Sequence, residues 1–226
     1  MEAEDKLIPV CNQINRKGTL KMAVFKNTKD AFETFKKEAD KFPNIYRECN
    51  PNSQVNVKFD TSQSQSFSLH FGSDILFFVL HSNVFEFNRD HEIMKTTYIR
   101  ENKDRAYCGM ISIYNFLSDS LFYNRYNDIG YLIGRIFINF ENHCYTDGKR
   151  ELSQIYNNFS TVIFDQNLAE LIMESAIQYT INFDLLVPPY EMMKEITIQD
   201  MLEINNKHMP IRTAKRLGFR FQADTE

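Results

Sequence analysis

The chain has 226 residues, of which 43% are hydrophobic and 25% are charged, a composition that excludes global disorder and allows one sizeable core. Its 26 basic and 30 acidic residues give a net charge of −4. This balance argues against a protein whose whole surface binds nucleic acid or an anionic membrane.

The longest apolar runs, residues 75–80 and 130–140, are shorter than the ~20 residues of a membrane-spanning helix. The start of the chain, MEAEDKLIPV, is acidic and lacks the basic and apolar regions of a signal peptide. We therefore expect no membrane partner and a cytoplasmic location. The four cysteines form no CxxC pair, so we expect reduced, mostly packed thiols.

The first half of the chain predicts one helix and several strands. Residues 1–27 show no steady period and predict a short helix or strand followed by a loop. From Lys29 to Phe42 the apolar side chains recur with helical spacing, and Pro43 is expected to end that helix.

Residues 55–60 and 66–71 alternate between polar and apolar side chains, which predicts two half-buried strands joined by a five-residue polar loop, TSQSQ. Residues 75–81 predict a third strand, and 83–87 either continue it or form an edge strand.

A charged surface connection is expected over residues 89–106, with a short strand at 96–99. A buried strand is predicted over 107–117, and an aromatic and polar segment over 121–128.

The second half predicts mainly helices. Asp147 is a candidate cap for a helix whose apolar side chains are Leu152, Ile155, Tyr156 and Phe159. Asp165 is a candidate cap for a helix that ends near Asn182, and a capping pattern at 197–200 predicts a last short helix to about Asn205.

This order predicts an α+β fold with a largely antiparallel sheet of about five or six strands within residues 55–145. An N-terminal helix and C-terminal helices are expected to pack on one face of that sheet. We expect a single domain over residues 1–226, with a sheet region at 1–146 and a helical region with a basic tail at 147–226.

The strongest candidate for a functional residue is Arg135, which lies inside the apolar run GYLIGRIFINF. An arginine is always ionised, and burial of an unpaired charge is very costly, so the fold must supply a carboxylate, carbonyls or a bound anion. As a strand, the run places Arg135, Asn139, Glu141 and His143 on one face; as a helix, it keeps Arg135, Asn139 and His143 together without Glu141. We favour a bent strand through residue 145.

A guanidinium, an amide and an imidazole in a row suit a carboxylate or phosphate ligand, with His143 available for proton transfer. The alternative is structural, because Arg135 could pair with Glu141, Glu151 or another acid, and ion pairs of this kind are common inside folds.

A second candidate is the segment FYNRYND, where Tyr123 and Arg125 could bind a planar anion by stacking and charge. The alternative is an ordinary loop with one local ion pair.

The sequence predicts no metal site and no cofactor. His70, His81 and His91 have no metal-ligand spacing, and the phosphate-loop, dinucleotide and hydrolase motifs are absent from the sequence. Cys144 follows His143, but neighbouring strand residues point to opposite faces and could not act together.

The basic tail, Lys207–Arg220, carries an excess of lysine and arginine with interleaved phenylalanines. It is the one segment expected to bind nucleic acid, although the alternation of Leu217, Phe219 and Phe221 also fits a terminal strand.

Two classes of function remain. The first, which we favour, is a non-enzymatic binding or sensing module for a small anionic ligand or a partner protein, and it could form a homo-oligomer. The second is a small-molecule or phosphate-ester enzyme in which His143 is the acid or base and Arg135 stabilises charge. The catalytic residues of such an enzyme are otherwise unknown.

Overall fold

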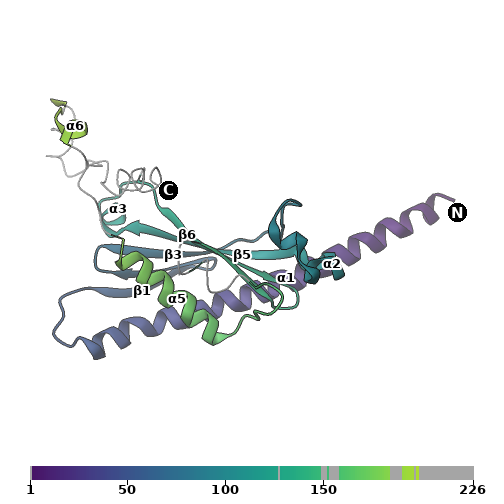
Figure 1. The fold of residues 1–226 in the computed structure, drawn as a ribbon, viewed down its shortest axis with the longest axis horizontal. Coiled ribbons are helices and arrows are strands. Elements are labelled where there is room, and N and C mark those ends of the chain that lie inside the picture. Colours follow the sequence, from purple (N-terminus) through teal and green to yellow (C-terminus); the bar gives the residue numbers. More distant parts are fainter. Residues whose placement is uncertain are drawn as a thin grey trace.

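A long N-terminal helix, an antiparallel sheet and a C-terminal helix form an α+β fold, as the sequence predicts (Figure 1). The computed structural model describes residues 2–126, 128–148, 152, 158–183, 190–195 and 197–198.

Within that part of the chain the sheet has seven strands, and all neighbouring strands are antiparallel. The strands are β1 (Val57–Gln63), β2 (Ser66–Phe71), β3 (Asp74–Leu80), β4 (Phe85–Glu86), β5 (Tyr107–Leu117), β6 (Tyr131–Asn139) and β7 (Cys144–Gly148). The spatial order is β1-β2-β3-β5-β6-β7, and the short β4 pairs with the beginning of β5. The strands predicted near residues 55–60, 66–71, 75–81 and 107–117 are therefore confirmed.

The described helical segments are α1 (Glu2–Cys49), η1 (Glu92–Lys95), α2 (Thr97–Glu101), η2 (Lys103–Ala106), α3 (Ser118–Phe122), α5 (Gln166–Ile181) and α6 (Tyr190–Met193). The predicted cap of α5 is confirmed, because the Asp165 side chain accepts a hydrogen bond from the backbone N–H of Leu168 at 2.7 Å.

The prediction for residues 1–49 is wrong in its boundaries, because α1 is one continuous helix of 48 residues. It contains both Pro9 and Pro43. A proline inside a helix costs ~3 kcal/mol, which normally ends it. Around Pro43 this cost is offset by packing, since Phe35 and Ala39 are fully buried before it and Arg47 donates to the Pro43 carbonyl after it.

Three local predictions are also wrong. The polar loop predicted at 61–65 is shorter, because β1 extends to Gln63 after a shift in its pairing with β2. The strand predicted at 96–99 is the helix α2, whose first turn is capped by the Thr96 hydroxyl. Asp147 is not placed at a helix start but within β7, where it pairs across the sheet with Arg135.

Other predictions fall on parts of the chain that the structure does not describe. They are most of the helix after Asp147, where only Leu152 is described as helical, most of the helix at 197–205, and the basic tail.

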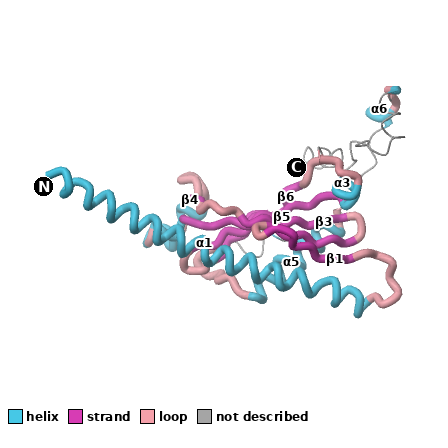
Figure 2. The backbone as a smooth tube through the Cα atoms, turned by 180° about the vertical axis from the view of Figure 1, so that it is seen from behind, coloured by secondary structure: helices cyan, strands magenta, loops and turns pink. Residues whose placement is uncertain are grey.

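Helices α1 and α5 lie on the same side of the sheet, as Figure 2 shows from behind. Between them and the sheet lies the main hydrophobic core, built from α1, β2, β3, β5, β6 and α5. Thr28 of α1 lies so close to β5 that a Cβ added to Gly109 would come within 2.0 Å of the Thr28 hydroxyl oxygen. Glycine at position 109 is therefore what allows α1 to approach the sheet.

A second, smaller apolar cluster lies near one end of the opposite face. The segment between β4 and β5, with η1, α2 and η2, folds back there over β5 and β6. The buried members of this second cluster are Ile93, Ile99, Ala106, Cys108, Phe137 and Phe159. This cluster brings α2 next to the turn between β6 and β7, where the polar residues singled out by the sequence lie.

Candidate functional site

The chain reverses between β6 and β7, so the single bent strand predicted through residue 145 is instead a hairpin. The backbone N–H of Asn139 donates to the carbonyl of His143 at 3.1 Å, which closes the turn. Asn142 adopts a left-handed conformation with φ of 63°, which asparagine tolerates better than most residues. The turn therefore places Asn139 and His143 opposite each other.

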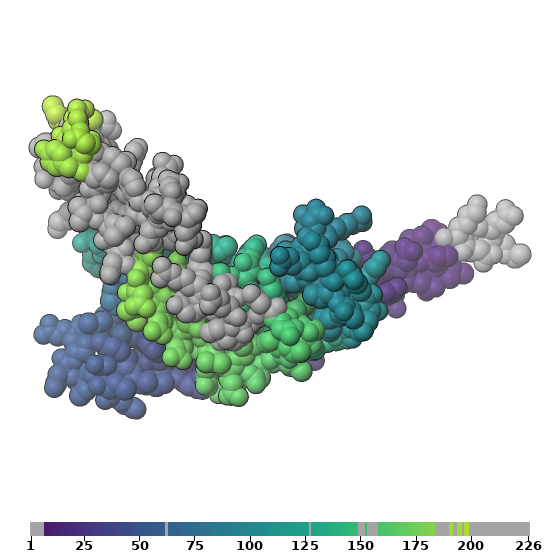
Figure 3. Space-filling view, in the orientation of Figure 1, coloured from purple at the N-terminus to yellow at the C-terminus, as the bar shows by residue number. Residues whose placement is uncertain are grey.

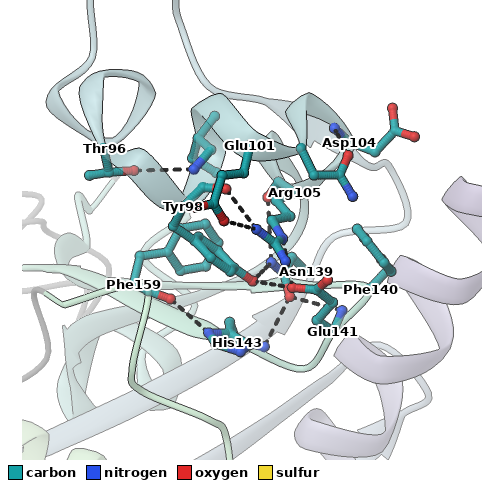
Figure 4. Close-up of polar contacts among 12 residues, drawn as sticks. Thr96, Tyr98, Glu101, Asp104, Arg105, Asn139, Phe140, Glu141, His143 and Phe159 are labelled. Carbon is teal, nitrogen blue, oxygen red and sulfur yellow. Dashed lines mark hydrogen bonds and ion pairs between the residues drawn. The ribbon is translucent and has the colours of Figure 1, made fainter.

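Asn139 is the centre of a polar cluster at this turn, drawn in Figure 4. Its side chain is completely buried. The Asn139 Oδ1 atom accepts hydrogen bonds from the backbone N–H groups of Glu141 at 3.0 Å and His143 at 2.9 Å. Its Nδ2 atom donates to the hydroxyl of Tyr98 at 2.9 Å. One amide thus fixes the shape of the turn and binds it to α2.

Glu141 joins the turn to the segment before β5. Its Oε2 atom accepts from the Tyr98 hydroxyl at 2.6 Å and from Arg105 Nε at 2.9 Å. The Arg105 guanidinium also donates to the Tyr98 carbonyl at 2.9 Å, and it lies over the Tyr98 ring, 4.3 Å from the ring centroid. Burial, followed by the hydrogen bond to Glu141, raises the pKa of Tyr98, so its hydroxyl stays protonated.

His143 closes the cluster on the other side. Its ring stacks on Tyr98 with the centroids 4.8 Å apart, and its Nδ1 atom lies 2.9 Å from the carbonyl oxygen of Phe159. A carbonyl can only accept, so Nδ1 carries a proton and the neutral ring has its lone pair on Nε2. In the neutral ring, Nε2 is therefore the nitrogen that could accept a proton.

Arg135 lies apart from this turn. Its direct cross-strand neighbour is Asp147 of β7, and its Nε and Nη2 atoms donate to the Asp147 carboxylate. The guanidinium also lies over the Phe137 ring at 5.5 Å, and both charged side chains are about two-fifths exposed, 42% and 41%. Arg135 and Asn139 are four positions apart along β6, a distance of about 13 Å. The structure therefore brings together Asn139, Glu141 and His143, but not Arg135.

Tyr123 and Arg125 lie in the loop after α3. Arg125 Nε is 3.2 Å from the Asp128 carboxylate, and the exposed fractions of these two side chains are only 9% and 8%. The Ser120 hydroxyl donates to the same carboxylate at 2.6 Å, while Tyr123 is exposed with its ring 6.0 Å from the guanidinium. The contacts are those of a loop closed by a local ion pair.

The histidines and cysteines that the structure describes do not gather into a metal site. Within the described ranges, no group of three or more His, Cys, Asp or Glu side chains is placed to hold a metal ion. His70 and His81 instead bond to the hydroxyls of Ser68 and Ser112. Cys144 is fully buried in the main core, which raises the pKa of its thiol, so it does not act with His143.

A different feature was missed by the sequence reasoning. The first part of α1 projects beyond the sheet, as Figures 1 and 2 show from opposite sides and Figure 3 shows in space-filling form. We call residues 2–19 of α1 the arm; every side chain from residue 7 to 19 is exposed. We call the sheet and the helices packed on it the body. Near the end of the arm, Arg16 forms an ion pair with Asp104 at 2.7 Å and the Lys17 ammonium lies over the Tyr107 ring.

The arm carries large apolar side chains in the open. Leu7, Val10 and Ile14 are 60%, 48% and 67% exposed. Their spacing of three and four residues puts them on one face of the helix. That face continues toward Val24 and Thr28, which are buried against the body. The spacing of these apolar residues could have indicated the arm from the sequence. The spacing becomes visible only if residues 1–27 are assigned to the same helix as the residues that follow.

A groove of about 570 Å³ lies at the other end of α1, between that helix and α5. Its lining includes Phe42, Ile45, Met173, Ile177, Gln178 and Ile181. The groove and the arm are therefore both apolar surfaces of α1.

Comparison with models of protein families, with curated proteins and with solved structures finds no match for this chain. Among the described residues, no helix combines the length and the apolar composition needed to cross a bilayer.

Proposed function

We propose that this protein is a non-enzymatic binding module whose partner is another protein, bound through the arm of α1. The observation that carries the proposal is the exposed stripe of Leu7, Val10 and Ile14 on a helix that projects from the body. Apolar side chains that line one face of an exposed helix are the usual anchors for a groove or a second helix on a partner.

The stability of the arm supports the same proposal. Most of the stability of a protein helix comes from packing of its apolar face, which the exposed residues 7–19 lack, and Pro9 inside the helix costs about 3 kcal/mol. Gly18 lowers the helix propensity further, by about 1 kcal/mol relative to alanine. Such a helix gains the most from a partner that buries its apolar face.

A small anionic ligand is less well supported. The arginines nearest to the candidate residues already have a carboxylate partner within the chain. The pairs are Arg105 with Glu141, Arg125 with Asp128 and Arg135 with Asp147. An anion would have to displace Glu141, Asp128 or Asp147 before it could bind. The contacts of these three ion pairs within the chain favour a structural role for them.

The alternative of an enzyme that uses His143 has one supporting observation, the free lone pair expected on Nε2 of its neutral ring. Against it, the carboxylate, hydroxyl and amide around His143 bond to one another and hold the turn. Such an enzyme would need a pH-dependent turnover that is lost in His143→Ala.

The test is photo-crosslinking in the source cells, with benzoylphenylalanine in place of Ile14. The matched control carries the same group in place of Asp40, an exposed residue on the body part of α1. We expect one recurrent protein adduct from position 14, identified by mass spectrometry, and its loss when Val10→Asp is added.

Equal adducts from positions 14 and 40, or none from position 14, would contradict the proposal. A small anion that co-purifies with the protein and is lost in Arg135→Ala, detected by native mass spectrometry, would favour a ligand-binding module instead.

A further inference from the structure

We infer that the partner of the arm is a second copy of this chain, and that two arms pair side by side in antiparallel orientation. This inference rests on the proposed function, because it names the partner of the same surface. Three properties of the arm support it: the placement of its apolar residues, the distribution of its charges and the space beside Gly18.

The apolar stripe is complementary to itself when one arm is reversed. Leu7 and Ile14 are equally far from the midpoint between Val10 and Cys11. An antiparallel pair centred on that midpoint places Leu7 opposite Ile14 of the second copy, and Val10 opposite Cys11. Because a twofold axis repeats each contact, every large exposed side chain of the stripe meets an apolar one.

The charges of the arm select the same orientation. By sequence the arm begins with three acids, Glu2, Glu4 and Asp5, and one base, Lys6, whereas its other end has two bases, Arg16 and Lys17, and no acid. Parallel arms would place acid beside acid and base beside base. In an antiparallel pair the end that is acidic by sequence lies toward the end that is basic by sequence, so the net charges of the two arms are complementary.

Gly18 leaves room for a second helix. It lies eleven positions after Leu7, on the same face of the helix, and no atom lies within 4 Å of a Cβ added there. Small residues at a contact allow two helix backbones to approach closely. The arms are short, so we expect a weak dimer that dissociates on dilution.

The first measurement is sedimentation equilibrium of the full chain from ~5 to ~500 µM, the range in which a weak dimer dissociates. We expect a monomer–dimer equilibrium for the wild type. Ile14→Asp should weaken the dimer at least about tenfold, because it places a charge at an apolar contact. Ile45→Asp is the matched control, since Ile45 is similarly exposed on the same helix but lies in the groove beside α5.

The second measurement fixes the orientation by disulfide formation. In a chain with Cys11→Ser and Cys49→Ser, which removes the two exposed thiols, Leu7→Cys and Ile14→Cys are made separately. Antiparallel arms predict that a mixture of the two proteins forms a crosslinked heterodimer under mild oxidation. Each protein alone should crosslink far less.

Each unfavourable result has a definite meaning. A wild-type protein that stays monomeric over the whole range overturns the inference, and so does efficient crosslinking of Ile14→Cys with itself, which indicates parallel arms. Weakening by Ile45→Asp also overturns it, because the arm would then occupy the groove of another copy. The proposed function stands or falls separately, since photo-crosslinking at position 14 reports a protein partner of any identity.

Discussion

Replacement of Asn139 by alanine tests whether the polar cluster at the β6–β7 turn holds the fold together. The side chain is fully buried and its Oδ1 atom accepts from two backbone N–H groups, those of Glu141 and His143. Without it, both donors lose their acceptor, at about 1–3 kcal/mol each, and the Tyr98 hydroxyl loses a donor. We expect a loss of about 3 kcal/mol in the free energy of unfolding.

For a chain of this size such a loss lowers the melting temperature by about 6–12 °C. The assay is urea and thermal unfolding followed by far-ultraviolet circular dichroism, since the chain has no tryptophan. Asn88→Ala is the matched control, because Asn88 is exposed and accepts one local backbone hydrogen bond, from Asp90. Its effect should stay within about 0.5 kcal/mol.

Asn139→Asp separates the two roles of the amide. The carboxylate keeps an acceptor for both backbone N–H groups, but it cannot donate to the Tyr98 hydroxyl and lies near the negative charge of Glu141. An intermediate loss of stability is expected. If Asn139→Ala changes the free energy of unfolding by less than about 0.5 kcal/mol, the turn does not depend on this side chain and our account of the cluster is wrong.

Three further predictions follow from other contacts. Gly109→Ala should destabilise the fold by about 1–3 kcal/mol, because the new methyl group overlaps Thr28, and Thr28→Ala in the same chain should recover part of that loss in urea unfolding. Burial, followed by the charge of Lys58, lowers the pKa of His70, so the unfolded chain binds its proton more readily. The free energy of unfolding should therefore fall as the pH drops below about 6.5, and His70→Gln should make this fall smaller. If the pH dependence of the variant equals that of the wild type, His70 is not its source. Arg105→Ala should destabilise the fold more than Arg135→Ala in urea unfolding, because Arg105 contacts both Tyr98 and Glu141, whereas the ion pair of Arg135 is exposed and should contribute less than about 1 kcal/mol. The reverse order would indicate that Arg135 is the structural arginine.

Much of the sheet is determined by local pattern. The alternation of residues 66–71 and the apolar run of 107–117 predict strands whose positions the structure confirms, because a half-buried strand repeats every two residues and a fully buried one is continuously apolar. The cap at Asp165 is likewise local, since it requires only a side-chain oxygen and an N–H three residues later.

Local pattern fails where distant contacts outweigh it. Pro43 is a helix-ending signal in the sequence, yet α1 continues through it because the sheet and α5 bury the residues around it. Residues 96–99 look like a strand, but the apolar cluster beneath them and the Thr96 cap hold them as a helix. Neither compensation is visible before the elements are packed.

The amino-acid sequence by itself determined that Arg135 needs a partner and that Asn139, Glu141 and His143 are chemically distinctive within an apolar run. Only the tertiary structure decided which partner each one has. Arg135 lies four positions before Asn139 on β6 and pairs with Asp147, whereas the turn gathers Asn139, Glu141 and His143. Folding of α2 and η2 over that turn supplies Tyr98 and Arg105 from far away in the chain. The same holds for the arm, because its apolar stripe is readable in the sequence, but only the position of the body leaves that stripe exposed to solvent.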